Sequence, residues 1–574
     1  MEVKITVNNH TIKTETDRTI LQVLRENGIN IPTLCQIDGF TPTGACRMCV
    51  VEIDGIKSLK TACSTFPVDG MNIKTHSPRV IKARKKITEL LLADHPDDCL
   101  YCQRNGNCEL QKLAEELHVR ERTLPARSSR KKRDLSGASI MRDPSKCILC
   151  GRCVRVCEEL QACTTLEFAN RGSETAIHTT FNQGINVSSC INCGQCIMVC
   201  PTGALHEKNH LAGIQDALNN PDKKVIAQID PGLTVSLART YDFKSGKDLN
   251  GLVVAALKKT GFDLVFDTAF ASDLRIMEEA SILKNKIDTG QKLPLFSSDC
   301  PAWIKFAEQF NPELLEQISP CKSPQQMIGS LLNRYWSEKN DINPENIYSV
   351  SITPCTARKF EAQRDEMTYK GVSSVDAVLT TREFIEFLNI NGLDMLQMEE
   401  EEPDSPFNSR SSAAKITAVA GGGTEALLRT LYYLYENDNI DNFKIKQLRG
   451  LKNHKEYTAK IGKRTCNFAV VSGQNAAKKL LNEIQNGRDD LHYVEVMACQ
   501  NGCIGGGGQP IGSDEKYLKL RYKTLYDMDS KESIKESYKN PSIQRIYKDL
   551  FQKPGSKKAE EFLYTHYTKR DIYL

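Results

Sequence analysis

The sequence predicts a multidomain chain in which small α+β modules precede a large α/β domain. Three observations carry this prediction. The chain has 574 residues, too many for one ordinary domain. Sixteen of its 22 cysteines lie before residue 201, most of them in tight Cys-x-x-Cys clusters. From about residue 210 onward, apolar strand-like runs alternate with helical patterns, which is typical of α/β organisation with buried, parallel strands.

Composition narrows the function classes. The formal net charge is only +4, so nothing indicates a nucleic-acid surface. We expect neither a transmembrane helix nor a secretory signal, because the sequence has no run of 18 apolar residues and no apolar stretch near Met1. Clustered cysteines without such a signal indicate metal ligation in a reducing compartment rather than a disulfide framework. We therefore expect a cytoplasmic protein with thiolate-bound metal centres and no membrane partner.

Residues 1–80 predict a small β-grasp domain. "VKITVNN" alternates apolar and polar residues like a half-buried strand, "TDRTILQVLRENG" reads as a capped amphipathic helix, and "VVEIDGIKSLKTAC" reads as a hairpin. The pattern resembles a plant-type 2Fe–2S ferredoxin with a lengthened first gap between cysteines, and a zinc site made of the same four thiolates is the alternative. The candidate ligands are Cys35, Cys46, Cys49 and Cys63.

Residues 81–125 contain "HPDDCLYCQRNGNC", which supplies His95, Cys99, Cys102 and Cys108. Four such ligands in one short stretch can also hold zinc. Their order resembles the His-ligated 4Fe–4S motif of iron-only hydrogenases and of the large iron–sulfur subunit of respiratory complex I. An imidazole in place of a thiolate makes such a site less negative and generally raises its potential.

Residues 125–134, "PARSSRKKRD", form a basic linker. We interpret it as a solvated connector, and the alternative is a docking patch for an acidic electron carrier such as ferredoxin.

Residues 137–209 carry an internal repeat, "CILCGRCVRVCE" and "CINCGQCIMVCP". Both runs resemble bacterial two-cluster ferredoxins, in which the fourth cysteine of each run ligates the other cluster. Pro201 follows the second run as in that family, whereas Glu158 replaces the proline after the first. Cys163 belongs to neither run, and we expect an ordinary buried thiol. The resemblance implies one 4Fe–4S cluster on Cys147, Cys150, Cys153 and Cys200, and another on Cys190, Cys193, Cys196 and Cys157.

Residues 210–574 form the predicted α/β domain. Three of its strand-like runs lead into Cys300, Cys355 and Cys499, and Cys503 follows one turn later. Sites in open α/β sheets lie at the carboxyl ends of strands, so we expect these four thiols to converge there. The predicted strands are "KVIAQIDP", "DLVFDTAF", "LPLFSSDC", "IYSVSITPC", "ITAVAGGG", "FAVVSG" and "YVEVMAC".

Three motifs in this domain resemble those of FeFe-hydrogenases. "SSDCPAW" is similar to TSCCPxW, "TPCTARKFE" to MPCxxKxxE, and "EVMACQNGCIGGGGQP" to ExMACxxGCxxGGGQP. With the upstream clusters, the resemblance covers the whole chain in the layout of monomeric clostridial enzymes. It implies an H-cluster, in which Cys300, Cys355, Cys499 and Cys503 hold a 4Fe–4S cubane. It also implies that Cys503 bridges to a two-iron unit with CO, cyanide and an azadithiolate.

The resemblance also implies contacts around that cofactor. We expect the glycines at 505–508 to let backbone approach it closely. Three departures indicate a divergent subgroup: Thr353 replaces the motif methionine, Arg358 replaces its lysine, and Gly232 stands where better-known members have a hydroxyl. The family places further cofactor contacts at Pro231, Ser323, Gln325, Arg358 and Met497.

Asp299 stands where the family has a cysteine that exchanges protons with the azadithiolate nitrogen. The resemblance implies a proton relay, and we expect burial beside an anionic cluster to raise the pKa of its carboxyl from about 3.9 toward neutrality. The alternative is that Asp299, like Ser298, caps the helix that begins near Pro301. Onward relay positions are Glu279 and Ser319, whereas Ile282 and Lys286 replace the usual Glu and Arg.

The function that the resemblance implies is reversible reduction of protons to H2, with electrons passing along the accessory clusters to or from ferredoxin. Maturation proteins are expected to supply the two-iron unit. A hydrogen sensor with the same cofactor is one alternative. An iron–sulfur assembly scaffold is another, although the complete third motif with Cys503 disfavours it. Cys163, Cys321 and Cys466 are left without a predicted ligand role.

Overall fold

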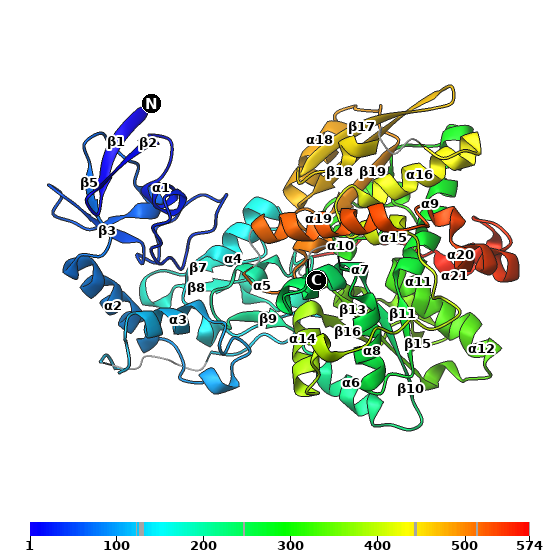
Figure 1. Ribbon diagram of the computed structural model, residues 1–574, viewed down its shortest axis with the longest axis horizontal. Helices are drawn as coiled ribbons and strands as arrows, with labels where there is room; N and C mark the ends of the chain where they lie inside the picture. Colours follow the sequence, from blue (N-terminus) through cyan, green and yellow to red (C-terminus); the bar gives the residue numbers. More distant parts are fainter. Residues whose placement is uncertain (122, 126–130, 245–246, 441–444, 513–514, 573–574) are drawn as a thin grey trace.

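The computed structural model describes all residues except 122, 126–130, 245–246, 441–444, 513–514 and 573–574. Part of the predicted basic linker therefore lies outside the described residues. Figure 1 shows a multidomain chain, which confirms the predicted fold class. Within the described residues we find no helix with the length and apolarity needed to cross a bilayer.

The N-terminal domain is a five-stranded sheet in the order β2-β1-β5-β3-β4. Its helix α1 begins with a capping box in which the Thr19 side chain and Gln22 satisfy each other's backbone amides, as the sequence pattern predicted. The bounds are β1 (Glu2–Val7), β2 (His10–Glu15), α1 (Ile20–Glu26), β3 (Val50–Ile53), β4 (Lys60–Thr61) and β5 (Asn72–Lys74).

Helices α2 (Pro78–Ala93) and α3 (Glu109–Glu116) lead from this sheet into the module around His95. The next module pairs strand β6 (Ile140–Arg142) with β9 (Leu205–Glu207). Figure 1 places this module, residues 137–209 and hereafter the cyan module, between the blue N-terminal elements and the large domain. Its remaining elements are α4 (Arg152–Arg155), β7 (Glu167–Ala169), β8 (Ala176–His178) and α5 (Gln195–Val199).

The large domain contains two four-stranded sheets, with orders β11-β10-β13-β16 and β12-β19-β18-β17. All pairings are parallel except that of β17 with β18, which form an antiparallel hairpin. The strands are β10 (Lys224–Ile229), β11 (Leu264–Asp267), β12 (Leu295–Phe296), β13 (Ile347–Thr353), β16 (Ala377–Thr380), β17 (His454–Ile461), β18 (Arg464–Ser472) and β19 (Tyr493–Met497).

One predicted strand is wrong. The run "ITAVAGGG" forms no strand beyond a single bridge between Val419 and Gly502. Gly421 adopts a left-handed φ of 94°, and the chain then starts helix α16 instead of extending. Glycine adopts such a φ readily, so this apolar run turns where periodicity alone indicated a buried strand.

Helix α19 contacts the loop after β19, where Arg521 donates a hydrogen bond to the carbonyl oxygen of Ile504. Helices and two short strands surround the two sheets. They are α6 (Leu211–Leu218), α7 (Pro231–Thr240), α8 (Asn250–Lys259), α9 (Ala269–Thr289), α10 (Pro301–Phe310), α11 (Pro324–Leu331), α12 (Ser337–Lys339), α13 (Ala357–Glu361), β14 (Thr368–Tyr369), β15 (Val372–Ser373), α14 (Thr381–Ile390), α15 (Ser412–Ile416), α16 (Gly422–Glu436), α18 (Gln474–Gln485), α19 (Glu515–Lys531), α20 (Pro541–Ile546) and α21 (Lys557–Leu563).

Buried arginines join the N-terminal modules to the middle one. Arg155 on α4 donates to the backbone carbonyls of Cys35 and Thr41. Arg152, also on α4, donates to both carboxylate oxygens of Glu109 at 2.6 and 2.9 Å. Both N-terminal modules therefore contact the same helix of the cyan module.

Candidate metal centres and active site

The four cysteines of the N-terminal domain lie together. Hydrogen-bond contacts join the thiol of Cys35 to those of Cys46 and Cys63, and the thiol of Cys63 to that of Cys49. The backbone amide of Leu34 points at the Cys46 sulfur at 3.3 Å. Neighbouring thiols with an amide directed at sulfur fit an iron–sulfur cluster.

His95 and its three partner cysteines occupy one short loop between α2 and α3. The imidazole is 8% exposed, and its Nδ1 lies 3.0 Å from the carbonyl oxygen of Pro96. Burial lowers the pKa of His95, which favours the neutral ring that ligates metals. When Nδ1 donates to Pro96, Nε2 is the ring nitrogen that carries the lone pair a metal would bind. Cys99 is exposed, so this loop reaches solvent.

The cyan module contains two cavities that are lined by cysteines. The first is lined by Cys147, Cys150, Cys153 and Cys200. The second is lined by Cys157, Cys190, Cys193 and Cys196.

Cys163, which has no predicted ligand role, also lines the second cavity. Backbone amides point at two of the surrounding sulfurs, at 3.3 Å from Thr165 to Cys157 and at 3.4 Å from Asn192 to Cys190. The structure thus brings together the cysteines of different runs, in the sets that the ferredoxin resemblance implies.

In the large domain Cys300, Cys355, Cys499 and Cys503 lie close enough together for the charge on one thiolate to affect the pKa of another. Each follows a strand or the turn after one. Burial raises the pKa of the Cys355 and Cys503 thiols well above the ordinary value, so a metal that binds here must displace their protons. The amide of Ala498 points at the Cys300 sulfur at 3.4 Å. These four thiols fit a cubane.

The glycines at 505–508 lie against backbone of the same protein, and their close approach to the cofactor stays a prediction. A Cβ on Gly507 would lie 2.1 Å from the carbonyl oxygen of Cys193, and one on Gly506 would lie 2.4 Å from that of Pro354. The missing side chains therefore let the third-motif loop touch backbone of the same protein. Gln195 adds a side-chain hydrogen bond of 2.9 Å to the Gly505 carbonyl. The loop after Cys499 thus lies directly on the loop of Cys193.

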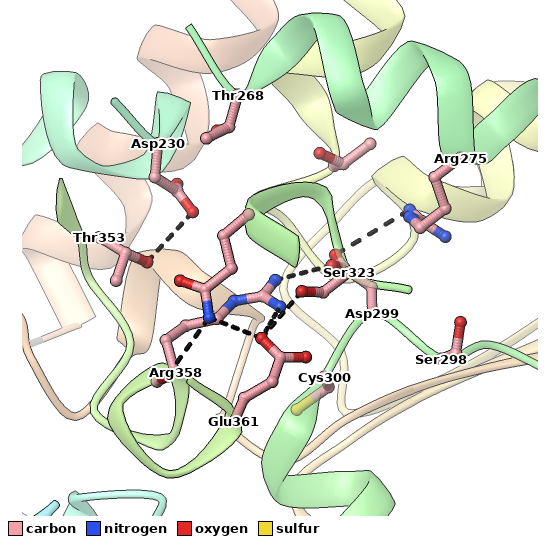
Figure 2. A network of polar contacts seen from close by, with 12 residues as sticks. Asp230, Thr268, Arg275, Ser298, Asp299, Cys300, Ser323, Thr353, Arg358 and Glu361 are labelled. Carbon is pink, nitrogen blue, oxygen red and sulfur yellow. Dashed lines mark hydrogen bonds and ion pairs between the residues drawn. The ribbon is translucent and has the colours of Figure 1, made fainter. Parts of the chain in front are cut away.

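Asp299 lies between two guanidinium groups, as Figure 2 shows. Arg358 donates to one carboxylate oxygen at 2.7 Å, and Arg275 approaches the other at 3.9 Å. Arg358 also donates to Glu361 at 2.9 Å, and Arg275 lies 2.5 Å from Glu279. Five buried charged groups of alternating sign therefore form one continuous chain at the edge of the thiol cluster.

Two expectations for Asp299 are wrong. Burial does raise the pKa of this carboxyl, but Arg275 and Arg358 outweigh that effect and hold the pKa below its ordinary value. The capping alternative also fails, since Cys300 is the N-cap residue of α10 and no side chain caps that helix. The Ser298 hydroxyl instead donates to the Cys321 carbonyl at 2.7 Å.

The other two predicted relay residues, Glu279 and Ser319, form their hydrogen bonds with groups other than Asp299. Glu279 receives hydrogen bonds from Ser298 at 3.3 Å and from Tyr493 at 3.2 Å, besides its pair with Arg275. The Ser319 hydroxyl accepts from the Cys321 amide at 3.3 Å. Ile282 packs against the apolar core, so that face of α9 offers no proton carrier there.

The implied cofactor contacts line the same region. Glu361 accepts hydrogen bonds from Ser323 at 2.8 Å and from Gln325 at 2.7 Å, which fixes both side chains. Pro231 opens α7 directly after β10, and Met497 ends β19 with 5% of its surface exposed. Ser323 and Gln325 thus offer polar groups and Pro231 and Met497 apolar ones, and a cofactor with diatomic ligands requires both kinds of contact.

Sequence reasoning gave no role to three residues of this site, Arg275, Glu361 and Asp230, although Glu361 ends the quoted motif "TPCTARKFE". Asp230 accepts hydrogen bonds from the Gly232 amide at 2.8 Å and the Thr353 hydroxyl at 3.1 Å. Burial raises the pKa of Asp230 to about 6. A carboxylate just before Pro231, at the carboxyl end of a predicted strand, was the available signal. Arg275 carries no motif that could have identified it.

Family comparisons agree with this arrangement. Residues 223–507 match the family described as iron only hydrogenase large subunit, C-terminal domain, and residues 515–570 match iron hydrogenase small subunit. Three upstream matches are a 2Fe-2S iron-sulfur cluster binding domain at 1–78, the NADH-ubiquinone oxidoreductase-G iron-sulfur binding region at 84–123, and a 4Fe-4S dicluster domain at 146–204.

Individual proteins match over the full length. The chain is 39% identical to the NADP-reducing hydrogenase subunit HndD of Solidesulfovibrio fructosivorans, with 99% of each chain covered. It is 35% identical to iron hydrogenase 1 of Clostridium pasteurianum, over 98% of this chain and 100% of that one. Among solved structures, a variant of the apo [FeFe]-hydrogenase HydA1 from Chlamydomonas reinhardtii is 32% identical. It matches with a TM-score of 0.57 over 63% of this chain and 99% of its own.

Proposed function

The chain belongs to the iron-only hydrogenase family, and on that premise we propose that it interconverts two protons and two electrons with H2 at the thiol cluster of the large domain. The observation that carries the proposal is the convergence of Cys300, Cys355, Cys499 and Cys503 at the ends of strands and their turns. The bound cofactor supplies the metal chemistry of H2 formation and cleavage. The protein supplies thiolate anchors, polar contacts and a water-poor pocket.

We propose the ligand sets from the grouping of cysteines. The four neighbouring thiols of the N-terminal domain suit one 2Fe–2S cluster. The His95 loop and the two cavities of the cyan module suit three accessory 4Fe–4S clusters. The proximity of neighbouring groups supports an electron route: Arg152 lies within electrostatic range of both Cys46 and Cys150, and Cys193 lies within electrostatic range of Cys499.

A small iron–sulfur protein of the ferredoxin type is the electron partner that we propose. The exposed Cys99 loop, with Leu100 86% and Tyr101 89% exposed, gives such a carrier direct access to the His95 end of the route. One relative is an NADP-reducing hydrogenase subunit, so electron transfer to a nicotinamide nucleotide through another subunit is the competing assignment. H2-dependent reduction of ferredoxin by the purified chain alone would separate the two.

Hydrogen sensing is a second candidate. The guanidinium groups at Asp299 and the apolar Ile282 both weaken the relay that the family motif implies, which favours slow turnover. Protons must reach the cofactor whether the chain acts as an enzyme or as a hydrogen sensor. Asp299, Glu279 and Ser319 therefore stay a predicted proton relay. A sensor would bind H2 with a spectroscopic change but evolve it slowly from a small reductant.

The first prediction tests the cofactor itself. We expect the infrared spectrum of the protein, matured with its assembly proteins, to show metal-bound CO and cyanide bands. Preparation without those maturation proteins serves as the control and should contain iron–sulfur clusters but no such bands. A matured protein that holds its accessory clusters and shows no diatomic bands would contradict the proposed function.

A further inference from the structure

We propose that Asp299 is a positioning residue for Arg358, and that the two departures from the family motifs form one matched unit. The inference rests on the proposed function, because it assigns the purpose of the unit to the cofactor pocket. The motif cysteine and the motif lysine are both absent in this chain. The side chains that replace them bind each other at 2.7 Å.

The geometry depends on the planar, fixed set of N–H donors that a guanidinium has and an ammonium lacks. Arg358 presents Nη2 to Asp299 and Nη1 to Glu361, so its planar fork spans two carboxylates. All three side chains have at most 14% of their surface exposed. A charge buried this deeply needs opposite charge and hydrogen bonds. A cysteine at position 299 would leave one arm of the fork without its acceptor.

Asp299 is itself held in place from the other side. Arg275 lies 3.9 Å from its second carboxylate oxygen and pairs with Glu279 at 2.5 Å. Helix α9, the loop before α10 and helix α13 thus each contribute to one charge chain, which is visible in Figure 2. The carboxylate therefore has little freedom to move, and it fixes the position of the guanidinium.

The position of Arg358 matters because of its surroundings. Its guanidinium lies within electrostatic range of the thiols of Cys300 and Cys355, which we propose as cluster ligands. In a water-poor site, a displaced unit charge changes the field at such sulfurs strongly. Asp299 thus acts on the centre through Arg358.

The test is a double-mutant cycle in the matured holoenzyme with Asp299→Cys, Arg358→Lys and the double variant, which restores both motif residues. The cyanide bands in the infrared report the polar surroundings of the cofactor. We expect each single substitution to shift these bands and to lower cofactor content several-fold, and the double variant to recover most of the content. Asp299→Asn, which keeps the shape and loses the charge, should give an intermediate shift.

Two further measurements make the outcome decisive. Arg429→Lys alters a buried arginine paired with Glu425 and Asp529 away from the proposed ligands, and it should leave the bands in place. Thermal unfolding of the same variants, loaded with iron–sulfur clusters only, should show the double variant more stable than the sum of the single losses implies. Additive band shifts together with additive losses in Tm would overturn the positioning role. A parent without diatomic bands would instead refute the proposed function, with the Tm cycle still deciding the pairing.

Discussion

At the scale of single residues, Cys163 is the cysteine whose role is least evident from its neighbours. It lines the same cavity as Cys157, Cys190, Cys193 and Cys196, yet its thiol donates to the Gln161 carbonyl at 3.1 Å. A thiol engaged with backbone is in place for packing and need not ligate metal.

We therefore predict that Cys163→Ser leaves the iron content of the purified protein unchanged, because the hydroxyl can keep the hydrogen bond to backbone. Cys157→Ser is the matched control and should cost the protein about one cubane. Iron analysis combined with electron paramagnetic resonance measures both. Loss of a cubane signal in the Cys163 variant would show that a fifth thiol takes part in ligation.

Other residues show how far sequence reasoning reaches. Motif spacing identified the two cysteine runs, whereas the exchange of the fourth cysteine between them, which the structure also shows, came from the ferredoxin resemblance. The pKa direction of Asp299 could not be predicted, because Arg275 and Arg358 come from elements 24 and 59 residues away in sequence. Charge pairs of that kind leave no periodic signal along the chain.

At the scale of elements, helix α2 supports the first cluster loop. Its buried Arg84 donates to the carbonyl oxygens of Met48 at 3.1 Å and Val50 at 2.9 Å, on either side of Cys49. One helical side chain therefore fixes the backbone that carries a proposed ligand. Sequence analysis predicted the cysteine loop but not helix α2, and the sequence offered no reason to connect Arg84 with that loop.

We predict that Arg84→Met destabilises this domain, at a cost of about 1–3 kcal/mol for each buried carbonyl left without a donor. Methionine keeps most of the apolar stem, so the loss reports the hydrogen bonds rather than packing. Thermal unfolding and the 2Fe–2S signal per chain measure the effect. Arg79→Met, on the exposed face of the same helix, is the control. Equal unfolding midpoints for the two variants would contradict the assigned role of Arg84.

At the scale of the whole molecule, two N-terminal modules meet one middle module, so electrons have two possible entry points. Cys99 of the His95 loop is exposed, whereas Cys35, Cys49 and Cys63 are buried. The contact between the first domain and the middle module depends on Arg155, which donates to the carbonyl of Cys35. The modules thus meet through side-chain contacts to backbone.

We predict that deleting residues 1–76 slows electron transfer from ferredoxin but spares H2 evolution from a small reductant. The cut precedes Ser77, which caps α2, so that helix keeps its start. Comparing the two assays on the same preparation separates carrier access from catalysis. If the deletion removes the diatomic infrared bands, the modules do not fold independently and the prediction fails.

The contact of Gly507 with Cys193 has a consequence for electron tunnelling. A Cβ at position 507 would lie 2.1 Å from the Cys193 carbonyl oxygen, so neither a side chain nor a water molecule fits between the two loops. Tunnelling rates fall exponentially with the width of the gap, and they fall faster across empty space than through packed atoms. The absence of a side chain at Gly507 therefore keeps the loop of Cys193 close to the loop after Cys499, which would shorten the tunnelling path between the two proposed centres.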